Sequence, residues 1–297
     1  MISTEFKQQV IAKLIELEKT SGQPASRFAT TLGLDGPRWS RLKKGDLDGV
    51  LSDSRFITIA REQDIQMGTA RDWLTVNTAT FEYITALLGT CHQQSISVLL
   101  VDMADIGKTH SAKHYARSNR DAVYLDCSQV KSKQLFVREI ARRFGVSNTG
   151  RYADVYRDLV FYINTLPNAL IILDEAGDLK YDAFLELKAL WNATEGNVGW
   201  FMMGADGLKA KLNRGIDNKK VGFTELFRRY GSSFRQVSPA GRDQLEEFRR
   251  DQVALVAKAN LPAGTDIQKL LKSSRGSLTN VRNMIQVMKR KTDNSQQ

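Results

Sequence analysis

A Gly-Lys-Thr tripeptide at residues 107–109 follows an apolar run and could bind phosphate. The run at 97–101 reads Ser-Val-Leu-Leu-Val, which is typical of a buried strand. A strand, a turn and then Gly-Lys-Thr is the order of a phosphate-binding loop, in which backbone N–H groups and a helix N-terminus hold the phosphate oxygens. Lys108 would place its charge at the β- and γ-phosphates, and the Thr109 hydroxyl would ligand Mg²⁺.

The loop departs from the usual pattern at its first position. The pattern G-x-x-x-x-G-K-[ST] begins with glycine, but this chain has Asp102 there. Asp105 is a second carboxylate in the loop, and either one would repel phosphate if it pointed inward. We therefore expect a weakened site that binds ATP and turns it over slowly. The residues expected to hold the nucleotide are Ala104, Asp105, Ile106, Gly107, Lys108, Thr109 and His110.

A second apolar run, at 168–176, contains two adjacent carboxylates, Asp174 and Glu175. Ligands of open parallel sheets bind beyond the carboxyl ends of the strands, so both motifs should converge on one crevice. Asp174 would hold Mg²⁺ together with Thr109, and Glu175 would orient and polarise the attacking water. The alternative is an ordinary buried strand that is followed by an acidic surface turn.

Strands and helices alternate around these motifs, which predicts an α/β domain with a parallel sheet covered by helices on both faces. The pattern does not fix the strand order. We expect strands at 98–101, 122–126, 168–174 and 198–204, and helices at 108–118, 133–144, 152–166 and 182–193.

The N-terminal region resembles a helix-turn-helix over residues 25–45. Ala29 stands where the two helices would cross, Gly33 falls at the turn, and Trp39 and Leu42 would anchor the second helix in the core. A small helical adaptor with a solvated basic face is the alternative. The hydrophobic pattern weakens between residues 65 and 80, so we place the end of an N-terminal domain near 75. The residues expected to face DNA are Arg38, Arg41, Lys43 and Lys44.

The charge of the chain favours a polyanionic partner. A length of 297 residues allows about two domains, and a net charge of +10 makes nucleic acid the first candidate. Because the sequence shows neither a membrane-length apolar run nor a signal peptide, we expect a cytoplasmic protein without membrane contact.

A second basic segment, at 207–220, is rich in Lys and Arg and contains no aromatic residue. We interpret it as a mobile loop that suits sequence-independent contact with phosphates better than base reading. A solvated loop without a role in binding explains the composition equally well. The residues concerned are Lys209, Lys211, Arg214, Lys219 and Lys220.

The order and spacing of the motifs at 107–109, 171–176, 201–204 and 226–230 resemble the AAA+ ATPases of DNA transposition. The resemblance implies an AAA+ core at 80–240 and an all-α lid with a basic tail at 241–297. It also implies ATP and Mg²⁺ as cofactors. Members of this family assemble on DNA as a helical filament and deliver the target to a transposase that they stimulate. For this chain we expect assembly into a helical filament or ring on double-stranded DNA, largely independent of sequence because its Lys and Arg residues are distributed.

The resemblance also assigns residues. Arg229 matches an arginine that could act as a finger in a neighbouring subunit's site, with Arg228 as its rival. Ala205 replaces a polar residue expected after the fourth strand. Thr279 replaces a lid arginine, so that Arg275 or Arg282 would have to substitute. Two alternatives stay open: a non-hydrolysing DNA-binding scaffold with a decayed loop, and a replication helicase loader.

Overall fold

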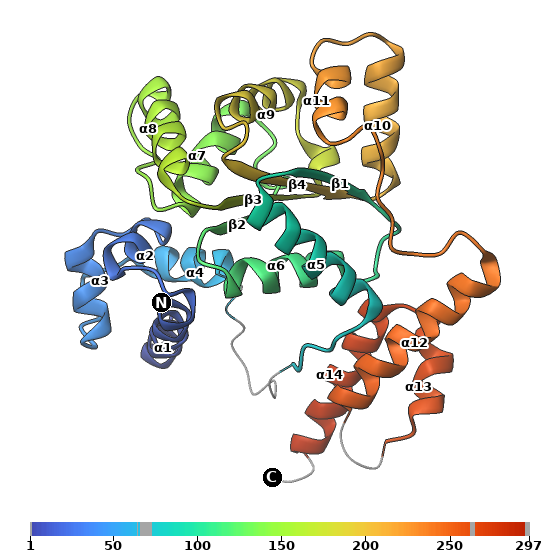
Figure 1. Ribbon diagram of the computed structural model, residues 1–297. Helices are drawn as coiled ribbons and strands as arrows, with labels where there is room; N and C mark the ends of the chain where they lie inside the picture. Colours follow the sequence, from blue (N-terminus) through green and yellow to red (C-terminus); the bar gives the residue numbers. More distant parts are fainter. Residues whose placement is uncertain (1, 64, 66–72, 262–264, 295–297) are drawn as a thin grey trace.

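The computed structural model describes residues 2–63, 65, 73–261 and 265–294, with side chains to residue 289. Buried side chains gather in an N-terminal helical part, an α/β core and a C-terminal helical part, which follow one another along the chain (Figure 1). The expected boundary between 65 and 80 falls partly on residues 66–72, which lie outside this description.

Four helices form the N-terminal part: α1 (Thr4–Ser21), α2 (Ala25–Thr31), α3 (Gly36–Lys43) and α4 (Asp53–Glu62). Ala29, Trp39 and Leu42 are buried between them, as the sequence predicts. Gly33 has φ +67° in the turn between α2 and α3, and a Cβ there would collide with the Arg55 guanidinium. Glycine is therefore favoured at this turn.

Ion pairs join the N-terminal part to the core. Arg27 Nη1 of α2 lies 3.1 Å from Asp121 Oδ1, just before the second strand. Arg142, near the end of the helix that follows that strand, lies 3.4 Å from Glu62 Oε2 of α4. Because α2 and α4 make these contacts, α3 is left at the outer edge of the molecule (Figure 1).

The core sheet has four parallel strands in the order β1-β4-β3-β2. Their bounds are β1 (Ser97–Val101), β2 (Ala122–Asp126), β3 (Ala169–Asp174) and β4 (Val198–Gly204). Arg235 forms a single parallel bridge with Leu100 on the outer side of β1. Since β4 separates β1 from β3, the carboxyl ends of β1 and β3 lie at the same edge of the sheet with one strand between them.

Helices cover both faces of this sheet, which confirms the expected α/β core. Val98 and Leu100 point toward α5 (Ala79–Gln94) and α6 (Lys108–Ser118), whereas Leu99 and Val101 point to the opposite face. That face is covered by α7 (Lys133–Arg143), α8 (Tyr152–Thr165), α9 (Tyr181–Ala193), α10 (Asp206–Asp217) and α11 (Phe223–Arg229). A short helix, η1 (Ala176–Asp178), follows β3.

One expectation is wrong. Residues 206–217 form the helix α10 rather than a mobile loop. Leu208, Leu212 and Gly215 recur at helical spacing and are buried against the rest of the core, including Phe223. This apolar stripe gives the segment a packed face despite its many cations.

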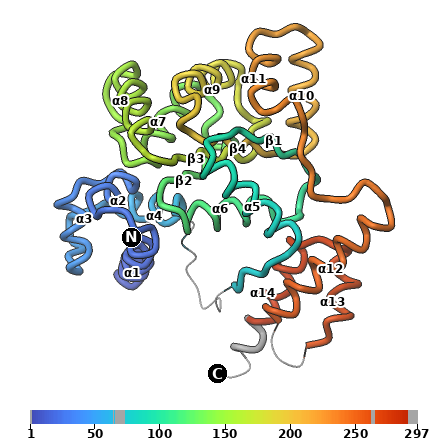
Figure 2. Tube along the Cα trace, in the orientation of Figure 1, coloured from blue at the N-terminus to red at the C-terminus, as the bar shows by residue number. Residues whose placement is uncertain are grey.

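Three helices form the expected all-α C-terminal part: α12 (Arg242–Asn260), α13 (Ile267–Ser274) and α14 (Leu278–Asn294). They share a small core of their own. These helices are called the lid below. Asn260 of α12 exchanges hydrogen bonds with the backbone of Leu74, so the chain passes the lid before it enters α5 (Figure 2). The expected basic tail begins at Lys289, and the side chains after that residue are not among those described. Among the described residues, none of the helices combines the length and apolar character needed to span a bilayer.

Candidate nucleotide-binding site

Lys108 lies where a phosphate-binding lysine should be, at the start of α6. Gly107 caps the helix with φ +98°, and the Lys108 side chain is 7% exposed. Its Nζ donates to the backbone oxygens of Asp102 at 2.8 Å and Met103 at 2.5 Å. Burial lowers the pKa of Lys108, while the nearby carboxylates, including Asp174, raise it. The ammonium is thus held inside the loop by two backbone oxygens.

Asp102 does not flank the phosphate position in the way that the sequence suggested. Its carboxylate accepts the N–H of Met103 at 2.7 Å, of Val237 at 2.7 Å and of Ser238 at 2.9 Å, together with the Ser238 hydroxyl. These donors tie the end of β1 to the segment that follows Arg235. The side chain has a structural task that glycine cannot perform, and four donors offset its charge.

The expected magnesium ligands, Thr109 and Asp174, are brought together. Thr109 Oγ1 donates to Asp174 Oδ2 at 2.7 Å, and Asp174 is 2% exposed. A hydroxyl and a carboxylate oxygen suit Mg²⁺, which prefers hard oxygen ligands. Tyr124 of β2 donates to the same Oδ2 at 2.8 Å. Burial first, and then Asp174, raise the pKa of Tyr124, so that it stays a donor.

Glu175 follows Asp174 with φ +49°, a left-handed conformation that costs energy in a residue with a side chain. Its backbone N–H donates to Asp174 Oδ1 at 2.9 Å. Burial and then Asp174 raise the pKa of Glu175, whereas Lys108 lowers it. A carboxylate with a raised pKa is a better proton acceptor near neutral pH.

The remaining loop residues lie between the core and the lid. Ala104 is exposed and Ile106 is buried, while Asp105 is bonded to Thr279 at the start of α14. His110 Nε2 lies 3.1 Å from the Thr75 hydroxyl. Burial, followed by cations that include Arg282, lowers the pKa of His110 and favours its neutral form.

The two candidate finger arginines differ in environment. Arg229 is half-buried, with its guanidinium carbon 4.6 Å from the centre of the Trp191 ring and Nη1 3.4 Å from the Lys188 oxygen. Arg228 is exposed. Both belong to α11, and the role of either one stays a prediction.

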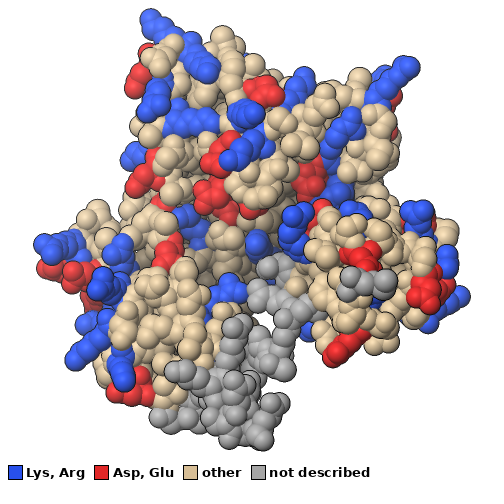
Figure 3. Space-filling model, turned by 180° about the vertical axis from the view of Figure 1, so that it is seen from behind, with Lys and Arg blue, Asp and Glu red and all other residues tan. Residues whose placement is uncertain are grey.

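The expected DNA-facing cations of α3 are exposed, but most of them are paired within the N-terminal part. Arg38 lies 3.5 Å from Asp35, Arg41 lies 2.8 Å from Asp46, and Lys43 lies 3.0 Å from Glu18. Lys44 is exposed at the end of the helix. Figure 3 views the molecule from behind, and there the Lys and Arg side chains of the described residues are interspersed with Asp and Glu.

The cations of the segment at 207–220 do not all face outward. Lys211 is half-buried, and its Nζ donates to the backbone oxygens of Gly177 at 2.8 Å and Leu179. Burial lowers its pKa. Lys211 therefore supports the turn that follows β3 instead of projecting toward a partner. Lys209 and Lys220 lie over aromatic rings, and Arg214 and Lys219 are exposed.

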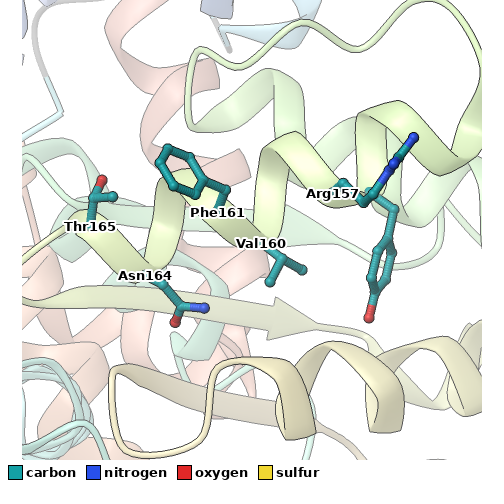
Figure 4. Close-up of a pocket in the computed structure, with 6 residues that line it drawn as sticks. Arg157, Val160, Phe161, Asn164 and Thr165 are labelled. Atoms are coloured by element: carbon teal, nitrogen blue, oxygen red, sulfur yellow. The ribbon is translucent and has the colours of Figure 1, made fainter.

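A shallow hollow of about 550 Å³ lies elsewhere, on the outer side of α8 (Figure 4). Phe161 stands on its rim with 75% of its surface exposed. The hollow contains none of the residues expected to bind nucleotide. Its lining residues are Tyr156, Arg157, Val160, Phe161, Asn164 and Thr165.

Comparison with known proteins supports the nucleotide site. Residues 97–212 match the model of the AAA domain family. The chain is 25% identical over 142 residues to the Mu-like prophage FluMu DNA transposition protein B of Haemophilus influenzae, covering 48% of this chain and 49% of that protein. The chain thus spans about half the length of this relative.

The solved structure of NtrX from Brucella abortus in complex with ATP is a more distant likeness. It has a TM-score of 0.43 and 14% identity, and it covers 84% of this chain and 58% of that one. Such a likeness is too remote to argue from. The fold rests instead on the parallel sheet and the AAA match.

Proposed function

This chain carries an AAA domain and resembles the Mu B-like AAA+ ATPases of DNA transposition, and from that premise we propose that it is an ATP-dependent DNA-binding protein that assembles on target DNA. In this proposal it then activates or directs a transposase. ATP and Mg²⁺ are the proposed cofactors, and double-stranded DNA is the proposed surface for assembly.

The observation that carries the proposal is the meeting of Lys108, Thr109 and Asp174 at one edge of the sheet. Lys108 and the N-terminus of α6 would hold phosphate oxygens. Thr109 and Asp174 would hold Mg²⁺, which would neutralise charge on the phosphates when bound. Glu175 would accept the proton of the attacking water.

The placement of Asp102 favours this proposal over a decayed loop. A carboxylate that met the phosphates would oppose ATP, but Asp102 is engaged by Met103, Val237 and Ser238. The loop therefore keeps its lysine at the start of α6, where Lys108 Nζ would exchange the Asp102 and Met103 backbone oxygens for phosphate oxygens. ATP would act mainly as a switch for assembly, with slow hydrolysis that DNA and neighbouring subunits stimulate.

Co-sedimentation with unrelated DNA duplexes, with and without ATP, tests the assembly. We expect ATP-dependent sedimentation that weakens steeply with salt, because phosphate contacts dominate. Arg229→Ala should bind ATP but lose hydrolysis and assembly, since an arginine finger acts in a neighbour's site. If it does not, Arg228→Ala is the next variant to test.

Two outcomes would refute the proposal. One is assembly that does not depend on ATP and is unchanged by Lys108→Ala, which would favour the non-hydrolysing scaffold. The other is co-purification with a helicase rather than a transposase, which would favour the helicase loader.

A further inference from the structure

Asp105 caps a helix of the lid from within the phosphate loop. Its Oδ1 accepts the Thr279 backbone N–H at 2.9 Å and the Thr279 hydroxyl at 2.5 Å, across 174 residues of sequence. Ser277 Oγ accepts the N–H of Asn280 at 3.0 Å. Two N–H groups in the first turn of α14 thus have acceptors, one supplied locally and one supplied by the loop.

The lid also touches the loop on either side of Asp105. Arg249 Nη2 of α12 lies 3.6 Å from Met103 Sδ. A Cβ at Gly107 would lie 3.7 Å from Leu278 Cδ1. Met103 and Asp105 therefore contact the lid, Gly107 lies beside Leu278, and the hydrogen-bonded contact of Asp105 is the most directional.

The backbone of Asp105 is in the left-handed region, with φ +66°. Aspartate tolerates this conformation better than most residues with a side chain. Its carboxylate lies at the positive end of the α14 dipole, where a negative charge is stabilised. The hydrogen bonds to Thr279 therefore fix both the Asp105 side chain and the start of α14.

We propose that Asp105 and Thr279 form a latch that holds the lid on the phosphate loop and sets how fast nucleotide leaves. This inference rests on the proposed ATP site. A nucleotide whose phosphates lie in the loop at 102–109 is enclosed where α12 and α14 meet that loop, so it leaves when the latch opens. Asp105 is a positioning residue here, because it acts through the lid.

Three single variants of the full chain separate the latch from simpler effects. Asp105→Ala removes the acceptor, whereas Asp105→Asn keeps an oxygen that can accept from Thr279 and removes the charge. Ser277→Ala is the matched control, because it removes the local cap of α14 without touching the loop.

Amide hydrogen exchange of the nucleotide-free proteins measures how often the contact between Asp105 and Thr279 opens. In Asp105→Ala we expect exchange to rise about five- to tenfold in both the loop at 103–107 and the start of α14, because a helix cap is lost. Ser277→Ala should raise exchange in α14 alone. Asp105→Asn should stay close to the parent.

Stopped-flow dissociation of a fluorescent ADP analogue measures the rate at which nucleotide leaves. Asp105→Ala should release the analogue about five- to tenfold faster than the parent, by the same loss of the cap. Asp105→Asn and Ser277→Ala should release it at close to the parental rate. Thr279→Val should speed release less than Asp105→Ala, and the double variant should be no faster than Asp105→Ala, because both changes break one contact.

Equal effects of Asp105→Asn and Asp105→Ala on release would overturn the latch, because charge rather than the cap would then control release. Unchanged exchange in Asp105→Ala would overturn it as well. If the parent fails to bind nucleotide, the proposed function fails, and the latch contact is then judged on the exchange data alone.

Discussion

The candidate nucleotide site and the cations that we expect to face DNA are built in opposite ways. Lys108 and Asp174 are almost completely buried, and hydrogen bonds fix both of them. Arg38 and Arg41 of α3 are exposed and lie beside carboxylates of the same domain. An exposed ion pair contributes only about 0–1 kcal/mol, whereas a buried polar network depends on every partner. Single substitutions should therefore be severe in one region and slight in the other.

The largest effect should come from Glu175→Gln. The amide cannot accept a proton from water, so turnover should fall about 10²- to 10⁴-fold while ATP binding persists. Phosphate release in the presence of DNA measures this effect. Glu195→Gln changes an exposed glutamate in the same way and should leave turnover unaltered. Turnover by Glu175→Gln close to that of the parent would remove Glu175 from the chemistry.

Asp102→Gly restores the glycine of the usual pattern, yet we expect it to weaken the protein. Val237 and Ser238 would lose the acceptor of their N–H groups, which should lower the free energy of unfolding by about 2–3 kcal/mol. Urea unfolding checks this prediction, with Asp48→Gly as an exposed control. A more stable variant, or one with tighter ATP binding, would contradict the role given to Asp102.

The pH dependence of turnover should be a smaller effect of the same site. Burial and Asp174 raise the pKa of Glu175, so the protonated, inactive form persists to higher pH than it would in an ordinary glutamate. Turnover should rise with pH as Glu175 loses its proton and then level off. Asp178 also raises this pKa, so Asp178→Asn should move the rise to lower pH. A shift to higher pH would contradict this assignment.

The smallest effects should come from single cations. Lys44→Ala should weaken DNA binding about two- to threefold and reduce the salt slope by about one. Lys211→Ala should leave DNA binding unchanged and lower the melting temperature, because the Gly177 and Leu179 oxygens lose a donor. Fluorescence anisotropy at two salt concentrations separates the two. Weaker DNA binding by Lys211→Ala than by Lys44→Ala would erase the contrast between the regions.

Much of the fold could be predicted because local patterns carry it. The strands at 122–126 and 198–204 coincide with β2 and β4, and helix 108–118 coincides with α6. The convergence of Thr109 and Asp174 follows from parallel strands sharing an edge. The helices α4 and α5 are not among the elements that the sequence analysis predicts. The segment at 206–217 was misinterpreted because it carries as many cations, three, as residues that pack against the core.

What could not be predicted depends on long-range contacts. In the sequence, Asp102 is a departure from the motif. Its role is explained only by hydrogen bonds from Val237 and Ser238, which lie 135 and 136 positions further along the chain. Thr279 stands where the family resemblance implies an arginine, and its partner Asp105 is 174 residues away in the sequence. Tyr124, a polar residue in an apolar strand, donates to Asp174, and the sequence analysis missed this role.

Calorimetric titration with ATP and Mg²⁺ tests the central claim, that the loop is a working nucleotide site, most directly. The parent should bind ATP, and Lys108→Ala should bind it about 10- to 100-fold more weakly, because a charged hydrogen-bond donor to phosphate is lost. No detectable binding by the parent, with Lys108→Ala identical to it in assembly on DNA, would show that the loop is a relic and contradict the account.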